Sequence, residues 1–233
     1  MRKSAIFLFF VTFCLTILGL SAQGGIAVPP QTARTKVKTE EKQKTEDSKQ
    51  RPVAKSKVYL LHSDLLRKDA SHPDAQIVTG NVKFRHDSVY MYCDSACYYD
   101  KVSSFEAFGN VKMVQGDTLF LYGDRLYYDG LTQIAEMRCN VRMENRTTTL
   151  LTDSLNYDRV YNLGYFFDGG TLMDEQNVLT SEWGEYSPQT KQSVFNYNVK
   201  LVNPQFTLTS DTLRYNTASK IADIVGPSDI WSD

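Results

Sequence analysis

The sequence predicts an all-β domain over residues 58–233, built from about six two-strand repeats of 29–30 residues. Three observations predict it. Two short motifs recur in fixed phase along this part of the chain. The residues of these motifs alternate in polarity with the period of two that a half-buried strand requires. No stretch after residue 57 shows the apolar period of an amphipathic helix. Repetition at such a period is typical of stacked supersecondary units.

Residues 1–23 have the pattern of a secretory signal peptide. Arg2 and Lys3 supply the positive region, residues 5–20 are almost entirely apolar, and small residues precede Gln23. A retained membrane anchor is the alternative, because the apolar stretch is only slightly shorter than a spanning helix. We therefore expect an exported protein whose leader is cleaved.

The formal net charge of −1 is a sum of unlike segments. Residues 24–57 hold nine Lys/Arg against four Asp/Glu, whereas residues 58–233 hold fifteen against twenty-three. The first segment has almost no large apolar side chains, so we expect a disordered basic linker. It is either a solvated spacer or a tether attracted to anionic membranes. The overall charge gives no reason to expect nucleic acid as a partner.

The first motif is Asp-x-apolar-x-Tyr. An apolar residue stands three positions before each acidic anchor and usually two positions after it, and a small residue directly precedes the anchor. Five positions would put the two apolar residues on opposite faces of a regular strand. We therefore expect a bulge or corner at the anchor, with its carboxylate bonding backbone donors that the bulge leaves free. The anchors are Asp64, Asp94, Asp124, Asp153, Glu182 and Asp211.

The second motif is Gly-Asn-Val-Lys, seen at Gly80 and Gly109, with Cys139 and Tyr197 in the glycine position of later copies. Alternate residues of each copy are apolar or glycine, and those between them are mainly polar. This predicts a half-buried strand with the glycine position on the apolar face. A weaker copy occurs at residues 168–172.

About a dozen such strands must hide their apolar faces from water. Two facing antiparallel sheets, or one flattened and rolled sheet, do this. A parallel β-helix is the alternative, whereas a propeller blade needs four strands and a longer period. The apolar faces supply the candidate lining of an interior groove: Val82, Phe84, Val111, Met113, Val141, Met143, Leu172, Val199, Leu201, Leu126, Leu155 and Leu213.

The sequence does not predict an enzyme. The carboxylates recur once per repeat, which favours a structural role over catalysis. His62, His72 and His86 lack metal-ligand spacing, and we expect them at surface or turn positions. No glycine-rich phosphate loop or nucleophile elbow is present. We therefore predict no catalytic residue, no metal site and no cofactor.

The expected mature chain has three cysteines, Cys93, Cys97 and Cys139. An odd count precludes full intramolecular pairing. We expect small buried hydrophobes, with a bridge from Cys139 to one of the others as the alternative. The chain also contains Asp-Ser/Thr-apolar tripeptides, which some exported proteins carry O-glycosylated. They begin at Asp87, Asp94, Asp117, Asp153 and Asp211.

Taken together, the leader, the Gly-Asn-Val strands and the Asp-x-Leu-x-Tyr strands resemble the OstA/LptA family over about residues 58–233. The longer repeat, the many tyrosines and the basic linker indicate a divergent branch. The resemblance implies an open antiparallel β-jellyroll, or β-taco, located in the periplasm. It also implies a non-enzymatic bridge component for lipopolysaccharide transport, with acyl chains shielded in the groove.

The resemblance also implies partners. These are the acyl chains of lipopolysaccharide and lipid A, and other OstA/Lpt-type β-jellyroll proteins that pair edge to edge. A head-to-tail homo-oligomer follows from the same geometry. The alternative function is an exported glycan- or protein-binding β-repeat module that uses a tyrosine-rich surface. Residues 224–230 resemble the start of another Gly-Asn-Val strand, so the domain either ends on a half-repeat or continues beyond residue 233.

Overall fold

The computed structural model describes residues 56–69 and 72–232. The predicted leader and residues 24–55 of the predicted linker lie outside this part of the chain. The strands are β1 (Tyr59–His62), β2 (Leu65–Asp69), β3 (His72–His86), β4 (Val89–Tyr99), β5 (Ser104–Gln115), β6 (Leu119–Asp129), β7 (Ile134–Asn145), β8 (Thr148–Asp158), β9 (Leu163–Phe166), β10 (Gly170–Asp174), β11 (Asn177–Ser181), β12 (Trp183–Tyr186), β13 (Gln192–Asn203), β14 (Phe206–Asn216) and β15 (Ile221–Trp231).

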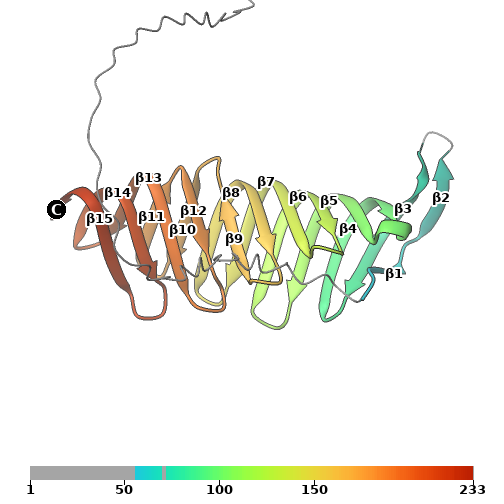
Figure 1. The fold of residues 1–233 in the computed structure, drawn as a ribbon, viewed down its shortest axis with the longest axis horizontal. Helices are drawn as coiled ribbons and strands as arrows, with labels where there is room; N and C mark the ends of the chain where they lie inside the picture. Colours follow the sequence, from blue (N-terminus) through green and yellow to red (C-terminus); the bar gives the residue numbers. More distant parts are fainter. Residues whose placement is uncertain (1–55, 70–71, 233) are drawn as a thin grey trace, which may run out of the picture. The chain divides into compact units, whose positions relative to one another are not determined.

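All these strands form one 15-stranded sheet in which strands close in sequence pair with each other. Every pairing is antiparallel, so the parallel β-helix alternative is wrong. The strands follow one another along the long axis of the sheet (Figure 1). The helical content of the described residues is one 3-10 turn, η1 (Asp100–Val102), and none of it is long and apolar enough to cross a membrane.

Each long strand turns a corner near its middle, as the first motif predicts. The register between β4 and β5 shifts between Tyr92 and Ser95, which brackets the anchor Asp94. On β5 the corner consists of Gly109 and Asn110, whose φ angles are +74° and +46°. Two successive residues in the left-handed region redirect a strand sharply, and this region favours Gly and Asn.

A hydrogen bond between neighbouring strands fastens the corners. The side-chain amide of Asn110 donates to the carboxylate of Asp94 over 2.8 Å. The pairs Asn81–Asp64, Asn140–Asp124 and Asn198–Glu182 repeat it at 3.0, 2.6 and 2.5 Å. The anchors therefore bond mainly a side-chain amide and not the backbone donors that we expected. One anchor, Asp153, does accept a backbone N–H, that of Asn140 at 3.2 Å.

One repeat, which contains the weaker second motif at residues 168–172 and the anchor Glu182, has broken strands instead of bent ones. The weak second motif is split into β9 and β10, and both halves pair with β8. The weak first motif is split into β11 and β12 around Glu182. Both fragments pair with β13, so the sheet stays continuous across the break.

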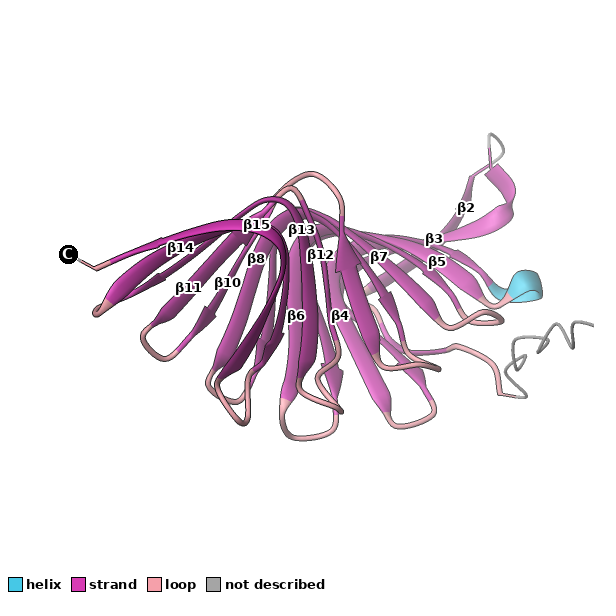
Figure 2. Cartoon of the chain, turned by 60° about the vertical axis from the view of Figure 1, so that its left-hand side comes forward, coloured by secondary structure: helices cyan, strands magenta, loops and turns pink. Residues whose placement is uncertain are grey.

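The corners divide the sheet into two walls with an interior between them (Figure 2). We call the strand halves on the tyrosine side of the corners the tyrosine wall, for example Ser104–Phe108 of β5 and Arg125–Asp129 of β6. The other half of each strand, on the far side of its corner, belongs to the facing wall, for example Val111–Gln115 of β5 and Leu119–Tyr122 of β6. One cluster of buried apolar side chains from both walls fills the interior. The predicted rolled antiparallel sheet is confirmed.

The structure at the corners contradicts one part of the predicted alternation. We expected Cys139 and Tyr197 on the apolar face, but both are exposed, and Tyr197 is 64% exposed. Their φ angles, +63° and +65°, place them inside the corner, where the left-handed conformation turns the side chain outward. Alternation resumes beyond the corner, so Val141 and Val199 are buried again.

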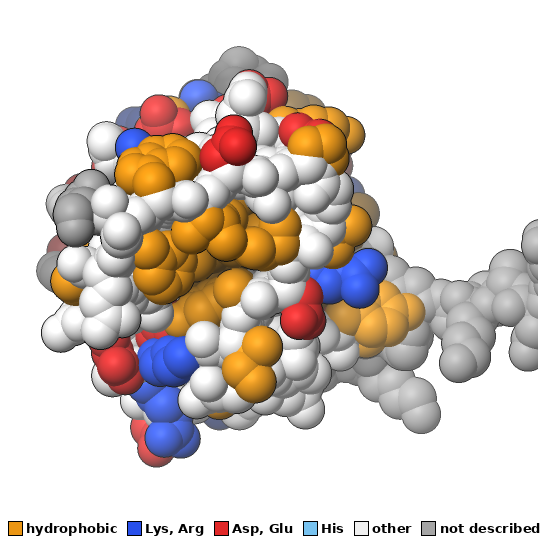
Figure 3. Space-filling model, turned by 90° about the vertical axis from the view of Figure 1, so that its left-hand side faces the viewer, with side chains coloured by type: hydrophobic (Ala, Val, Ile, Leu, Met, Phe, Trp, Pro, Cys, Tyr) orange, Lys and Arg blue, Asp and Glu red, His pale blue; other side chains and the backbone are white. Residues whose placement is uncertain are grey.

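The two ends of the sheet are strands with one free edge. Among the described residues, β15 pairs with β14 alone, and β1 and β2 both pair with β3. On β15, Ile224 and Ile230 pair opposite the buried Leu213 and Leu208, so they lie on the interior side, yet they are 37% and 60% exposed. Apolar side chains gather at the centre of this end of the sheet (Figure 3).

Candidate functional site: the interior and its seam

The twelve candidate lining residues all lie in the interior. Each is at most 3% exposed, and they come from both walls. Because antiparallel partners share a face, Met113 and its partner Leu121 both point inward. The twelve residues are therefore buried between the walls, and the interior is filled by side chains of the described residues.

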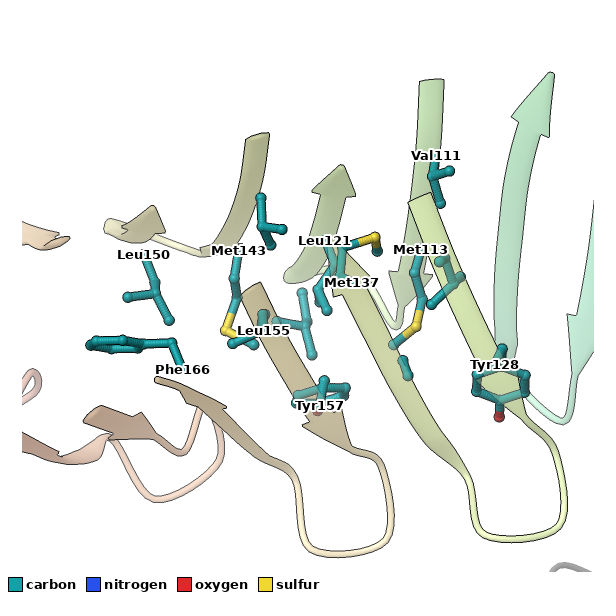
Figure 4. Close-up of a cluster of buried hydrophobic side chains, with 14 of the residues drawn as sticks. Val111, Met113, Leu121, Tyr128, Met137, Met143, Leu150, Leu155, Tyr157 and Phe166 are labelled. Atoms are coloured by element: carbon teal, nitrogen blue, oxygen red, sulfur yellow. The ribbon is translucent and has the colours of Figure 1, made fainter. Parts of the chain in front are cut away.

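Three methionines lie in the middle of the interior. Met113, Met137 and Met143 are at most 1% exposed and lie among leucines, including Leu121 and Leu155 (Figure 4). Methionine has three flexible torsions and a polarizable sulfur, so it repacks around differently shaped apolar neighbours. The middle of the interior is thus suited to repacking around apolar groups of different shape.

Aromatic rings fill the interior near β3. Phe84 and Phe105 stack with ring centroids 4.1 Å apart and planes inclined by 12°. Tyr98 and Tyr128 pack at their edges, with centroids 5.3 Å from Phe84 and 5.5 Å from Phe105 respectively. Interlocked rings are stiffer than methionine chains, so this end is the more rigid part of the interior.

Opposite the corners, the rims of the two walls meet along a line of hydrogen bonds that we call the seam. The tyrosine of the first motif contributes from the tyrosine wall in five repeats, and its hydroxyl contacts the rim of the facing wall. The five contacts are Tyr98 with the carbonyl of Val58 at 2.7 Å, Tyr128 with Nδ1 of His86 at 2.7 Å, Tyr157 with Nε2 of Gln115 at 3.4 Å, Tyr186 with Oδ1 of Asn145 at 3.3 Å and Tyr215 with Oδ2 of Asp174 at 2.7 Å.

We call each of these five tyrosine contacts a rung. A second side chain reinforces each rung. It comes from a turn on the tyrosine rim and reaches the same residue of the facing wall. The five are Ser103 Oγ to the Val58 N–H at 2.8 Å, Arg159 to His86 at 3.1 Å, Asn162 Oδ1 to Gln115 at 2.8 Å, Lys191 to Asn145, and Lys220 to Asp174 at 2.7 Å. The seam is therefore a double row of side-chain bonds.

Burial sets the protonation states in the seam. Burial raises the pKa of Tyr128 to about 12, and the nearby Arg159 guanidinium partly opposes the increase. Burial is also the largest cause of the raised pKa values of Tyr157 and Tyr215. These hydroxyls therefore keep their protons at neutral pH and remain able to donate.

His86 is a correction to the expected surface or turn position. Its side chain is fully buried and lies between Tyr128, Arg159 and Ser56, whose Oγ is 2.9 Å from Nε2. Burial first, and then the charge of Arg159, lower the pKa of His86, while Asp87 opposes the decrease. Of the other histidines, His62 is exposed as expected. In the described part of the chain, no cluster of three or more His, Cys, Asp and Glu side chains could hold a metal ion.

Sequence reasoning missed the seam, although its signal was present. The tyrosine is the last residue of the first motif, and each rung joins it to a residue 40 to 42 positions earlier. The alternative function, a glycan- or protein-binding module, requires the abundant tyrosines on a recognition surface. The five rung tyrosines are at most 5% exposed, so they are unavailable to a glycan or protein at that surface.

The three described cysteines are free thiols. Cys93 is buried, as we expected, and burial raises its pKa to about 12. Cys139 is exposed because it lies in a corner, which contradicts the prediction of a small buried hydrophobe. No bridge joins it to Cys93 or Cys97.

Cations on the outer side of the sheet lie over aromatic rings. The Lys112 ammonium lies 5.5 Å from the centroid of the Tyr122 ring, and the Arg142 guanidinium lies 4.3 Å from it. Both residues alternate with buried ones, Met113 and Met143, along their strands. The two faces of the sheet are therefore sharply different, apolar inside and cationic–aromatic outside at this point.

Comparisons with known proteins found one family and a similar solved structure. A family model described as OstA-like protein matches residues 55–211. Among solved structures, the crystal structure of LptH matches with 12% sequence identity and a TM-score of 0.46, covering 49% of this chain and 94% of that chain. LptH is described as the LptA homologous periplasmic component of the conserved lipopolysaccharide transport device from Pseudomonas aeruginosa. No curated protein matches the chain.

Proposed function

Because the chain belongs to the OstA-like protein family, we propose that it is a non-enzymatic periplasmic component of lipopolysaccharide transport whose interior shields acyl chains from water. One observation carries the proposal. A single apolar interior runs along the sheet between two walls, and on the side opposite the corners the described residues close it only through bonds that involve a side chain.

The chemistry of the interior supports an acyl chain over other ligands. The twelve lining candidates are Val, Leu, Met and Phe, with no charged or hydrogen-bonding side chain among them. Burying hydrocarbon in such surroundings contributes about 0.8 kcal/mol for each methylene group. The methionines in the middle of the interior adapt to chains of different length. A polar sugar would leave its hydroxyl groups unpaired there.

The ends of the sheet support partners of the same architecture. β15 has a free edge beside the exposed, inward-facing Ile224 and Ile230, and at the other end Leu66 of β2 faces inward and is 49% exposed. Pairing one free edge with another covers these groups and joins two interiors end to end. We therefore propose edge-to-edge pairing with other OstA-like proteins or with a second copy of this chain.

The test is site-specific photocrosslinking in cells of the native host. A photoreactive residue at Met113 or Met143 is expected to capture lipopolysaccharide, because both side chains point into the interior. The matched controls are Lys112 and Arg142, one residue away on the same strands and on the outer side. Capture from the outer positions alone would place the lipid outside and refute the proposal.

A further inference from the structure

We propose that the seam is the entrance for the acyl chains, which pass sideways between the two rims while the polar head of the lipid stays outside. This inference rests on the proposed function and identifies how its site is reached. It differs from entry through an end of the sheet, in which the rims stay joined while the chains thread along the interior.

The first argument is that the interior has no room for a ligand while the seam is closed. All twelve lining candidates are at most 3% exposed, and the largest buried side chains include the rings of Phe84, Phe105, Phe166 and Phe195. Interiors packed in this way accept additional atoms only when their walls move. An acyl chain can therefore enter only if the two walls separate.

The second argument is that the walls can separate at the seam alone. At the corners the chain continues from one wall into the other, so separation there would break the chain or its backbone ladder. Across the seam, every hydrogen bond between described residues of the two rims involves a side chain. Such bonds exchange with water at small net free energy, so the seam is the weak side.

The third argument is that the closed seam is incompletely bonded. Only four buried polar side-chain atoms of the described residues lack a hydrogen-bond partner, and two of them, Gln115 Oε1 and Arg159 Nε, belong to the seam. A buried polar atom without a partner favours a state in which water reaches it. Opening the seam satisfies both atoms.

The charges along the tyrosine rim suit a lipid whose head is anionic. The turns of this rim place Arg159, Lys191 and Lys220 in three successive repeats. Lys191 bonds the neutral Asn145, whereas Lys220 is paired with both Asp174 and Glu175. A phosphate-bearing head that remains outside the rims would meet this row of cations while its chains contact the interior.

The experiment locks the seam covalently. Cys93, Cys97 and Cys139 are first replaced by Ala, and a photoreactive residue is placed at Met143. The substitutions Gln115→Cys with Asn162→Cys, and Asn145→Cys with Lys191→Cys, then put thiols on opposite rims, at two pairs whose native side chains bond across the seam. A short bis-methanethiosulfonate reagent links each pair, and dithiothreitol removes the link.

The matched controls use the same reagent on pairs within one rim. Asn156→Cys with Tyr165→Cys joins β8 to β9 near the tyrosine rim, where the Asn156 side-chain amide donates to the Tyr165 hydroxyl over 3.1 Å. Val114→Cys with Phe120→Cys joins β5 to β6 near the facing rim, where the two residues are antiparallel partners. These links constrain the protein without joining the walls.

Purified lipopolysaccharide is then offered to each protein, and capture at position 143 is measured over time. We expect the cross-seam links to slow capture at least tenfold, reduction to restore it, and the same-rim links to change it less than twofold. Restoration by reduction also shows that the locked protein was folded. If the cross-seam-linked protein captures lipid at the unlinked rate, the chains enter through an end and the inference is wrong.

A second measurement reverses the order. Protein loaded with lipopolysaccharide before linking is expected to retain it at least tenfold longer when the link crosses the seam, and equally rapid release would contradict the inference. Failure of the unlinked protein to capture any lipid at position 143 would refute the proposed function itself, and the inference with it. The unlinked protein thus separates the two failures.

Discussion

Each corner of the sheet joins residues from adjacent strands into one small unit. At the Gly109 corner, the left-handed pair Gly109–Asn110 turns the strand, and Asn110 donates to Asp94 on the preceding strand. Asp94 in turn occupies the space that a side chain at residue 109 would need, since an added Cβ would lie 2.5 Å from its Oδ2. The two motifs keep a fixed phase because their side chains meet at the corner.

Substitution Gly109→Ala is therefore expected to destabilise the domain by about 2–3 kcal/mol. The left-handed backbone accounts for about 1–2 kcal/mol, and displacement of Asp94 from Asn110 adds about 1 kcal/mol for a lost hydrogen bond. The free energy of unfolding in urea measures the effect. The control is Cys139→Ala, which removes only an exposed thiol at a corner where a side chain is already accommodated. Equal losses in the two variants would contradict the explanation.

The buried imidazole of His86 makes stability depend on pH. Burial and Arg159 lower its pKa in the folded protein below the ordinary value of 6.5, whereas the unfolded chain retains that ordinary value. The unfolded state therefore binds more protons in the pH range just below 6.5. The contribution of His86 to stability is complete above that range and is lost as the pH falls through it.

We accordingly expect the urea midpoint of the wild-type domain to fall between pH 7.5 and pH 5, and to fall less in a His86→Gln variant. Glutamine keeps polar atoms beside Tyr128 and Ser56 but does not titrate. The difference between the two proteins isolates this residue from carboxylates that titrate in both. An identical pH response in wild type and variant would show that the His86 imidazole is not held neutral.

Among the elements, β15 is distinguished by its exposure. Nearly all its residues are exposed, although its partner β14 is largely buried on its interior side. A long edge strand with apolar residues is a template for pairing with another strand. Its composition thus agrees with a surface that a second β-sheet covers.

Substitution Ile230→Lys is expected to weaken self-association or partner binding at least tenfold, because it places a charge on the interior side of this edge. The control Ile221→Lys introduces the same charge at a residue that is also 60% exposed, opposite Asn216 on the outer side of the sheet. Sedimentation velocity over a concentration series gives the association constant of each protein. Equal weakening by both substitutions would mean that the interior side of β15 is not specifically involved.

At the scale of the whole domain, the rungs show that the strands are tilted. Tyr128 on β6 meets His86 at the end of β3, not a residue of its own or the adjacent strand. Each rung therefore ties a repeat to one further back along the sheet. Closing a sheet on itself requires such a stagger between the edges that meet. The seam consequently couples neighbouring repeats as well as the two walls.

The fold was predictable because its rules are local. A period of two assigns each side chain to a face, and the twelve candidates chosen in this way are all buried. The five-residue spacing around the anchors predicted the corners, which the register shifts confirm. Errors arose where the corner suspends the alternation, at Cys139 and Tyr197, because the conformation of a left-handed residue does not follow the period of a strand.

The sequence by itself determined the repeat, the face of each strand residue and the positions of the corners. The tertiary structure alone decided which rims meet. The burial of His86 and the pairing of Tyr157 with Gln115 depend on strand tilt, which is set by the twist of the entire sheet and by packing between its walls. A local pattern carries no information on that stagger, so the interior appeared in the sequence as an open groove. In the folded protein, the hydrogen bonds of the seam close this groove.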